Sequence, residues 1–210
     1  GNISDRVGEN TYNISTGDSS GRRIFGFVRP AYPSSVDGIT GGVAHEVQGL
    51  DMDTDGSTDP EDMKDPYYQS TTSITTADGK YYDASKVNYV VVAKGSTDLL
   101  GCLATIYDHQ TGMTIACVAA DSGPRSDDWN EVSVCAARSL GYEVSGNYGV
   151  GTDKRFTITY FPDCKLTLYA NGHGDINSQI NAQATAYKSS QSGSDYNPNF
   201  DADNESGRVD

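Results

Sequence analysis

The sequence predicts a mostly-β domain, closer to a barrel than to a sandwich, with one α-helix at about residues 131–140. Residues 88–93 (NYVVVA) are a β-branched apolar run typical of a buried strand. Two apolar stretches, 102–107 and 113–120, flank five residues that include a glycine, which indicates a β-hairpin. The helix is favoured by closely spaced apolar residues followed by Gly141. A double-psi arrangement is one form that such a barrel takes.

Shorter patterns predict the other elements. Residues 23–28 (RIFGFV) are a strand candidate that ends before a proline. The acidic stretch 49–65, which contains glycine and proline, predicts a loop, and the Thr-rich segment 69–76 predicts an extended edge. Alternating apolar residues at 156–161 (FTITYF) and 165–169 (KLTLY) predict two more strands.

Composition predicts one domain between two tails. Residues 1–22 are polar and rich in Gly, Ser and Asn, and residues 188–210 read as an acidic flexible tail. The intervening 23–187 is long enough to bury a core without disulfides. Because the chain opens with Gly1 rather than Met, we expect that a secretion signal preceded it and that the protein is extracellular or at the cell surface.

The charge is strongly acidic and unevenly placed. The formal net charge is −14, and residues 46–65 contain eight acids against Lys64. Such a field repels phosphate backbones, so nucleic acid is not an expected partner. No apolar run is long enough for a membrane span, so membrane insertion is not expected either. The acidic stretch instead predicts a cationic ligand, and we expect a monomer.

Cysteine and histidine patterns disfavour several chemistries. The four cysteines show no C-x-x-C spacing, which argues against a zinc ribbon. The three histidines, His45, His109 and His173, fall on predicted loops, so histidine-assisted nucleophilic catalysis is disfavoured. No glycine-rich phosphate loop or G-x-S-x-G motif is present.

Two carboxylates stand at the borders of predicted elements. Asp121 follows the apolar strand 113–120, and Glu131 opens the predicted helix ten residues later. Regular elements would hold both at one cleft, as the acid and base of a two-carboxylate glycosidase require. Two structural roles compete with this: a turn cap for Asp121, and a favourable helix-dipole position for Glu131.

An aspartate-rich segment offers a second chemistry. Asp51, Asp53, Asp55 and Gly56 match the start of a D-x-D-x-D-G calcium loop. The twelfth position is Asp62 rather than Glu, and the flanks carry no helical pattern, so an EF-hand is not predicted. We therefore expect no bound metal, and an isolated Ca²⁺ loop at Asp51, Asp53 and Asp55 is the weaker alternative.

Together these segments resemble the family 75 glycoside hydrolases, the chitosanases. The segments that carry the resemblance are LDMDTDG at 50–56, DPYYQSTTS at 65–73, VNYVVV at 87–92, ADSGP at 120–124, NEVSVCAA at 130–137, and FTITYFP at 156–162.

The resemblance implies an endo-acting hydrolase of β-1,4-linked glucosamine polymers that works with inversion and needs no cofactor. It places the essential carboxylates on Asp121 and Glu131. It also implies substrate contacts for the acidic run, Asp51, Asp53 and Asp55, and for Gln69 and Thr72. A cationic polysaccharide, chitosan or partly acetylated chitosan, would then be the partner of the acidic stretch.

Two questions stay open at this level. Glu131 at a helix N-terminus would have a lowered pKa and suit the base role, whereas desolvation would reverse this. The chain could also be a non-catalytic carbohydrate-binding domain, given its 14 tyrosines, or a calcium-binding cell-surface domain.

Overall fold

The computed structural model describes residues 22–23 and 36–195 of the 210-residue chain. The predicted strand at 23–28 therefore lies outside the described residues except for Arg23, as does nearly all of the predicted tail at 1–22. Arg22–Arg23 form the short strand β1, which pairs antiparallel with β7 (Tyr142–Glu143).

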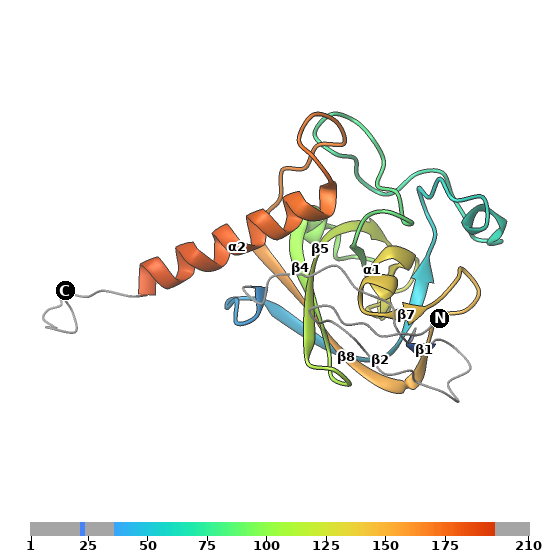
Figure 1. Cartoon of the computed structure of the whole chain (residues 1–210), viewed down its shortest axis with the longest axis horizontal. Coiled ribbons are helices and arrows are strands. Elements are labelled where there is room, and N and C mark those ends of the chain that lie inside the picture. Colours follow the sequence, from blue (N-terminus) through green and yellow to red (C-terminus); the bar gives the residue numbers. More distant parts are fainter. Residues whose placement is uncertain (1–21, 24–35, 196–210) are drawn as a thin grey trace, which may run out of the picture.

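Six strands close into a barrel, which confirms the predicted mostly-β, barrel-like fold (Figure 1). Their order around the barrel is β2-β6-β3-β5-β4-β8. The pairs β2/β6 and β3/β5 are parallel, and the other pairs are antiparallel. Side chains fill the interior, as in other small barrels. The strands are β2 (Val43–Asp53), β3 (Tyr89–Val92), β4 (Cys102–Asp108), β5 (Met113–Ser122), β6 (Glu131–Ser133) and β8 (Val150–Lys165).

The predicted hairpin and buried strand are confirmed. β4 and β5 pair antiparallel around a turn in which Gly112 has a φ of 76° and donates its N–H to the Asp108 carbonyl at 2.7 Å. β3 is buried along its whole length. Strands buried on both faces read as continuous apolar runs, which is why β3 and β5 stand out in the sequence.

The prediction of a loop over 49–65 is wrong for its first five residues, because β2 continues to Asp53. Leu50 and Met52 are buried there between acidic residues, so charge masks the strand pattern. At Gly49, with a φ of 73°, the register with β8 shifts. A Cβ at this position would lie 2.7 Å from the Val150 carbonyl oxygen, so the bend requires glycine.

β8 replaces the two strands predicted at 156–161 and 165–169. The first range is the middle of this 16-residue strand, and the second prediction is wrong because the strand ends at Lys165. Against β4, Phe161 faces Leu103 and Lys165 faces Cys102, so residues 162–164 form a bulge. Pro162 lies in this bulge, where its lack of an N–H group breaks no hydrogen bond of the strand ladder.

The predicted helix at 131–140 is present but shorter. Helix α1 spans Val134–Ser139, and its first three predicted residues instead form β6. Ser133 is the N-cap, and its Oγ accepts the Ala136 N–H at 3.1 Å. The same Oγ accepts the Tyr89 N–H, so residues 131–133 pair with the barrel and α1 begins at Val134 rather than at Glu131.

A second helix, α2 (Ile176–Asp195), was not predicted and includes 188–195 of the predicted tail. In Figure 1 it crosses the barrel beside β4 and β5 and extends beyond it. Ile180 and Ala184 are fully buried, and much of the remaining contact is polar. Gln183 accepts the Thr167 N–H at 3.0 Å and donates to the Thr167 carbonyl at 2.7 Å. This polar docking explains the weak apolar periodicity.

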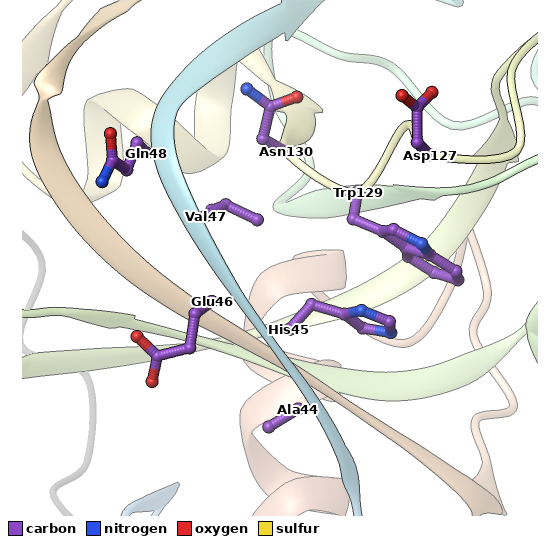
Figure 2. Close-up of a pocket in the computed structure, with 8 residues that line it drawn as sticks. All are labelled: Ala44, His45, Glu46, Val47, Gln48, Asp127, Trp129 and Asn130. Atoms are coloured by element: carbon purple, nitrogen blue, oxygen red, sulfur yellow. The ribbon is translucent and has the colours of Figure 1, made fainter.

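Other predicted segments differ in detail. Residues 69–76 contribute only the isolated bridge of Thr75 with Tyr81, not an edge strand. His45 lies on β2 rather than on a loop, and its ring stacks on Trp129 with centroids 3.9 Å apart (Figure 2). Within the described part of the chain, neither helix is long and apolar enough to cross a membrane.

Candidate functional site

A cleft of about 740 Å³ lies beside the ends of β2 and β5 and the start of β6. Its other walls come from segments around residues 65–69, 123–128 and 146–149. Among the described residues that line it, Arg125 is the one cation. Seven carboxylates face the cleft: Asp51, Asp53, Asp55, Asp65, Asp121, Asp128 and Glu131.

Asp121 and Glu131, the predicted catalytic pair, flank one residue of β3. Val91 pairs with Asp121 of β5, and the adjacent Val90 pairs with Val132, which places Glu131 opposite Val91 on the other side. Residues that face each other across a sheet project to the same side. Two strand spacings put the backbones of the two acids about 10 Å apart.

A β-bulge positions Asp121. Val90 pairs with Ala119 and Val91 pairs with Asp121, so Ala120 is the extra residue in β5. Bulges turn the following side chain, and they recur beside active sites for that reason. The Asp121 Oδ1 atom accepts the Ser73 N–H at 3.0 Å and the Ser73 hydroxyl at 2.9 Å, which holds the carboxyl group in place.

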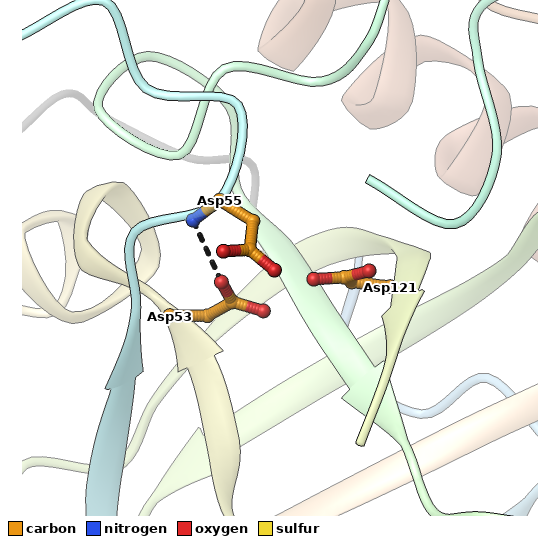
Figure 3. A group of neighbouring side chains, drawn as sticks. All are labelled: Asp53, Asp55 and Asp121. Atoms are coloured by element: carbon orange, nitrogen blue, oxygen red, sulfur yellow. Dashed lines mark hydrogen bonds between the residues drawn. The ribbon is translucent and has the colours of Figure 1, made fainter. Parts of the chain in front are cut away.

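Asp53, Asp55 and Asp121 converge in the cleft, with one carboxylate oxygen of each within 4.8 Å of the others (Figure 3). The Asp55 N–H donates to Asp53 at 2.8 Å, and the Asp121 side chain is hydrogen-bonded to both other carboxyl groups. A hydrogen bond between two carboxyl groups requires a proton on one of them. The group that forms is therefore Asp53, Asp55 and Asp121, whereas the motif predicted Asp51 with Asp53 and Asp55.

Burial and mutual repulsion raise pKa values in this cluster. Desolvation is the main cause that raises the pKa of Asp53 well above its usual value, and its bond to Asp121 adds to this. Desolvation and Asp121 likewise raise the pKa of the half-buried Asp55 to about 8. The Gln69 N–H, which donates to Asp55 at 2.9 Å, acts in the opposite direction and lowers this pKa. Asp53 and Asp55 therefore retain protons at neutral pH.

Glu131 and Asp51 face each other in the parallel β2/β6 pair. Desolvation raises the pKa of Glu131 to about 9, with Asp128, Asp121 and Asp51 adding repulsion. The helix-dipole argument for a lowered pKa is wrong, because Glu131 opens a strand rather than α1. Burial determines its protonation, and Glu131 carries a proton at neutral pH.

Asp128 was not singled out as a site residue. Its side chain is hydrogen-bonded to Glu131 and is 5 % exposed. Gly123 makes room for it, because a Cβ there would lie 3.0 Å from the Asp128 Cγ. The sequence DSGPRSDDWNE does not indicate whether Asp127 or Asp128 points into the cleft. The conformation of the loop determines that Asp128 is buried and Asp127 is exposed.

The other predicted contacts differ in placement. Gln69 lines the cleft, whereas Thr72 does not. Thr72 is buried beside it, where its hydroxyl donates to the Ile74 carbonyl at 2.8 Å and accepts the Tyr82 N–H. Tyr67 was not predicted, yet it lines the cleft and is 86 % exposed, with its N–H donating to Asp65 at 3.0 Å.

No protein-family model matches this chain, and no curated protein matches it. Among solved structures, Streptomyces papain inhibitor is similar over 54 % of this chain and 94 % of its own, with 16 % sequence identity and a TM-score of 0.29. A likeness at this level carries no argument about what the chain does.

Proposed function

We propose that the protein is a glycoside hydrolase, an endo-acting chitosanase that cleaves β-1,4-linked glucosamine polymers with inversion. The observation that carries this proposal is the pair Asp121 and Glu131 on either side of Val91, with the pKa of Glu131 raised to about 9. A protonated carboxyl group and a second carboxyl group across an open cleft are the machinery of glycoside hydrolysis.

In the proposed reaction Glu131 is the general acid. Its proton passes to the glycosidic oxygen as the bond from that oxygen to C1 breaks. Asp121 accepts a proton from water, and the water oxygen bonds to C1 from the opposite face. Inversion needs about 6.5–9.5 Å between the two carboxyl groups, which backbones two strand spacings apart accommodate. Exchange with solvent then restores both groups.

The remaining carboxylates of the cleft would recognise the amine groups. Chitosan is a polycation below its amine pKa, so it is attracted to a cleft with seven carboxylates and one arginine. Asp53 and Asp55, beside Asp121, are the proposed ammonium contacts; a bound ammonium group favours their ionised forms, so its binding would release the protons that they hold without ligand. The exposed ring of Tyr67 is a surface against which a sugar can stack. Acting on a polymer, the protein would work outside the cell or at its surface, as a monomer.

A reducing-end assay on highly deacetylated chitosan, with colloidal chitin and peptidoglycan beside it, tests the proposal. We expect release from chitosan, and a loss of at least a hundredfold in Glu131→Gln and Asp121→Asn. Glu61→Gln is the control, because that acid is exposed and outside the cleft. Binding of chitosan without release would instead indicate a non-catalytic carbohydrate-binding domain, and full turnover in either cleft variant would contradict the assigned roles.

One observation favours a cation as a second candidate. The oxygens of Asp53, Asp55 and Asp121 lie within 4.8 Å of one another, and hard cations such as Ca²⁺ prefer such ligands. Ca²⁺ would displace the protons that Asp53 and Asp55 hold. If EDTA lowers the melting temperature and Ca²⁺ restores it, the cluster is a structural calcium site; equal melting with and without EDTA removes this candidate.

A further inference from the structure

A second groove, of about 480 Å³, lies along β2 next to the acidic cleft. The groove and the cleft are lined by neighbouring parts of the same two segments. On β2, residues 44–48 line the groove, and residues 51–53 line the cleft. From the opposite wall, Trp129 and Asn130 face the groove, whereas Asp128 and Glu131 face the cleft. The groove therefore continues the cleft along one seam.

The backbone leaves this part of β2 accessible. β6 pairs only with residues 51–53 of β2, while residues 43–48 and Leu50 pair with β8 on the other side. Among the described strands, none covers the second edge of β2 beside the groove. The Asp51 N–H donates to the Asn130 carbonyl at 3.0 Å, which joins a residue that lines the cleft to one that lines the groove. An extended polymer could therefore pass from one hollow to the other.

Trp129 is held rigidly in the groove. Its indole stacks on the His45 imidazole at an interplanar angle of 11°, and it meets the Tyr160 ring edge-on at 5.3 Å (Figure 2). The Tyr160 hydroxyl in turn donates to the Val91 carbonyl at 2.7 Å. Trp129 remains half-exposed. A fixed, half-exposed aromatic ring loses little entropy on binding a flat ligand surface.

Polar groups accompany this ring. The Asn130 side chain has no hydrogen-bond partner among the described residues, and it offers both donors and an acceptor. Asp127 is exposed at the same groove and pairs with Arg125 at 3.3 Å. An aromatic face flanked by an amide and a carboxylate suits a sugar ring with hydroxyl and amine substituents.

We propose that this groove is an accessory subsite for the polysaccharide chain that occupies the acidic cleft. A sugar unit several positions from the cleaved bond would stack on Trp129 and hydrogen-bond to Asn130 and Asp127. This inference rests on the proposed function and adds to it a direction: the bound polymer runs along β2. Long chains would then bind more tightly than short ones.

The sequence contains one tryptophan, so intrinsic tryptophan fluorescence reports on this groove alone. The test titrates the full chain carrying Glu131→Gln with glucosamine oligomers of increasing length. We expect short oligomers to bind without changing the fluorescence, and long ones to change it and to bind about three- to tenfold more tightly. A fluorescence response that is absent at every length overturns the subsite.

Kinetics on the active enzyme separate this inference from the proposed function. Trp129→Ala should raise KM for long oligomers about three- to tenfold, with kcat and the KM for short oligomers unchanged, and Trp129→Phe should restore most of the affinity. Tyr107→Ala is the matched control, because it removes an exposed ring that contacts His109 in the β4/β5 hairpin and lines neither the groove nor the cleft. Unchanged KM in Trp129→Ala overturns the subsite but leaves the hydrolase. Failure of the unmodified protein to hydrolyse chitosan overturns the function, and the fluorescence titration then decides the groove separately.

Discussion

Asp121 and Glu131 stand on opposite sides of Val91, with strand β3 alone between their own strands. Their backbones are about two strand separations apart, and the hydrogen bonds of the two carboxyl groups go to different partners. Each carboxyl group therefore works with its own neighbours: Asp121 with Ser73, and Glu131 with Asp128. The closed barrel fixes the distance, because shifting either acid would break a ladder of strand hydrogen bonds.

Glu131→Gln should make the protein more stable while it abolishes activity. Burial raises the pKa of Glu131, so the folded state disfavours the charge that the unfolded chain carries freely at pH 8. An amide removes this cost, and we expect a gain of about 1 kcal/mol, or roughly 2–4 °C in melting temperature. Calorimetry at pH 8 measures it, with Glu61→Gln as the exposed control. A lower melting temperature in Glu131→Gln would contradict the argument.

Stability should fall as the pH rises from about 4 to 9. The pKa of Asp55 is raised to about 8 and that of Glu131 to about 9, so the folded state holds protons that the unfolded chain has released. The resulting stabilisation is complete below the usual carboxyl pKa values and is lost as the pH rises through these higher ones. Urea unfolding at several pH values measures this slope. Asp55→Asn should flatten it, and an equal slope in that variant would refute the assignment.

Gly123→Ala should impair Glu131, the proposed general acid, without changing that residue itself. The added Cβ would displace the Asp128 side chain, which is hydrogen-bonded to Glu131. We expect kcat to fall about tenfold or more, with the basic limb of the pH–rate profile shifted. Ser126→Ala, an exposed change in the same loop, is the control. If kcat and the profile stay unchanged, Asp128 does not position Glu131.

Gln183→Ala should loosen α2 from the barrel. The Gln183 amide makes two hydrogen bonds to the backbone of Thr167, and truncation leaves both backbone groups to water. We expect a loss of about 1–2 kcal/mol in the free energy of unfolding, measured in urea. Ser189→Ala, at an exposed position of the same helix, should be neutral. Equal stability of the two variants would show that apolar contacts alone hold α2.

Some of the fold was readable from local pattern. β3 and the β4/β5 hairpin were predicted because fully buried strands appear as apolar runs and because a glycine marks the turn. The end of β2 was not predicted because Asp51 and Asp53 alternate with the apolar residues Leu50 and Met52. A stretch with this many acidic residues is more typical of a loop than of a strand. α2 was missed because glutamine-to-backbone bonds replace much of the apolar face that periodicity detects.

By itself, the sequence determined the fold class, the acidic character of residues 46–65 and the two carboxylates at element borders, Asp121 and Glu131. Only the tertiary structure decided which acids meet. Strand register placed Asp51 against Glu131, and the convergence of β2 with β5 brought Asp121 to Asp53. Protonation followed from that arrangement, because desolvation and like charges act through space, between residues that are far apart in the chain.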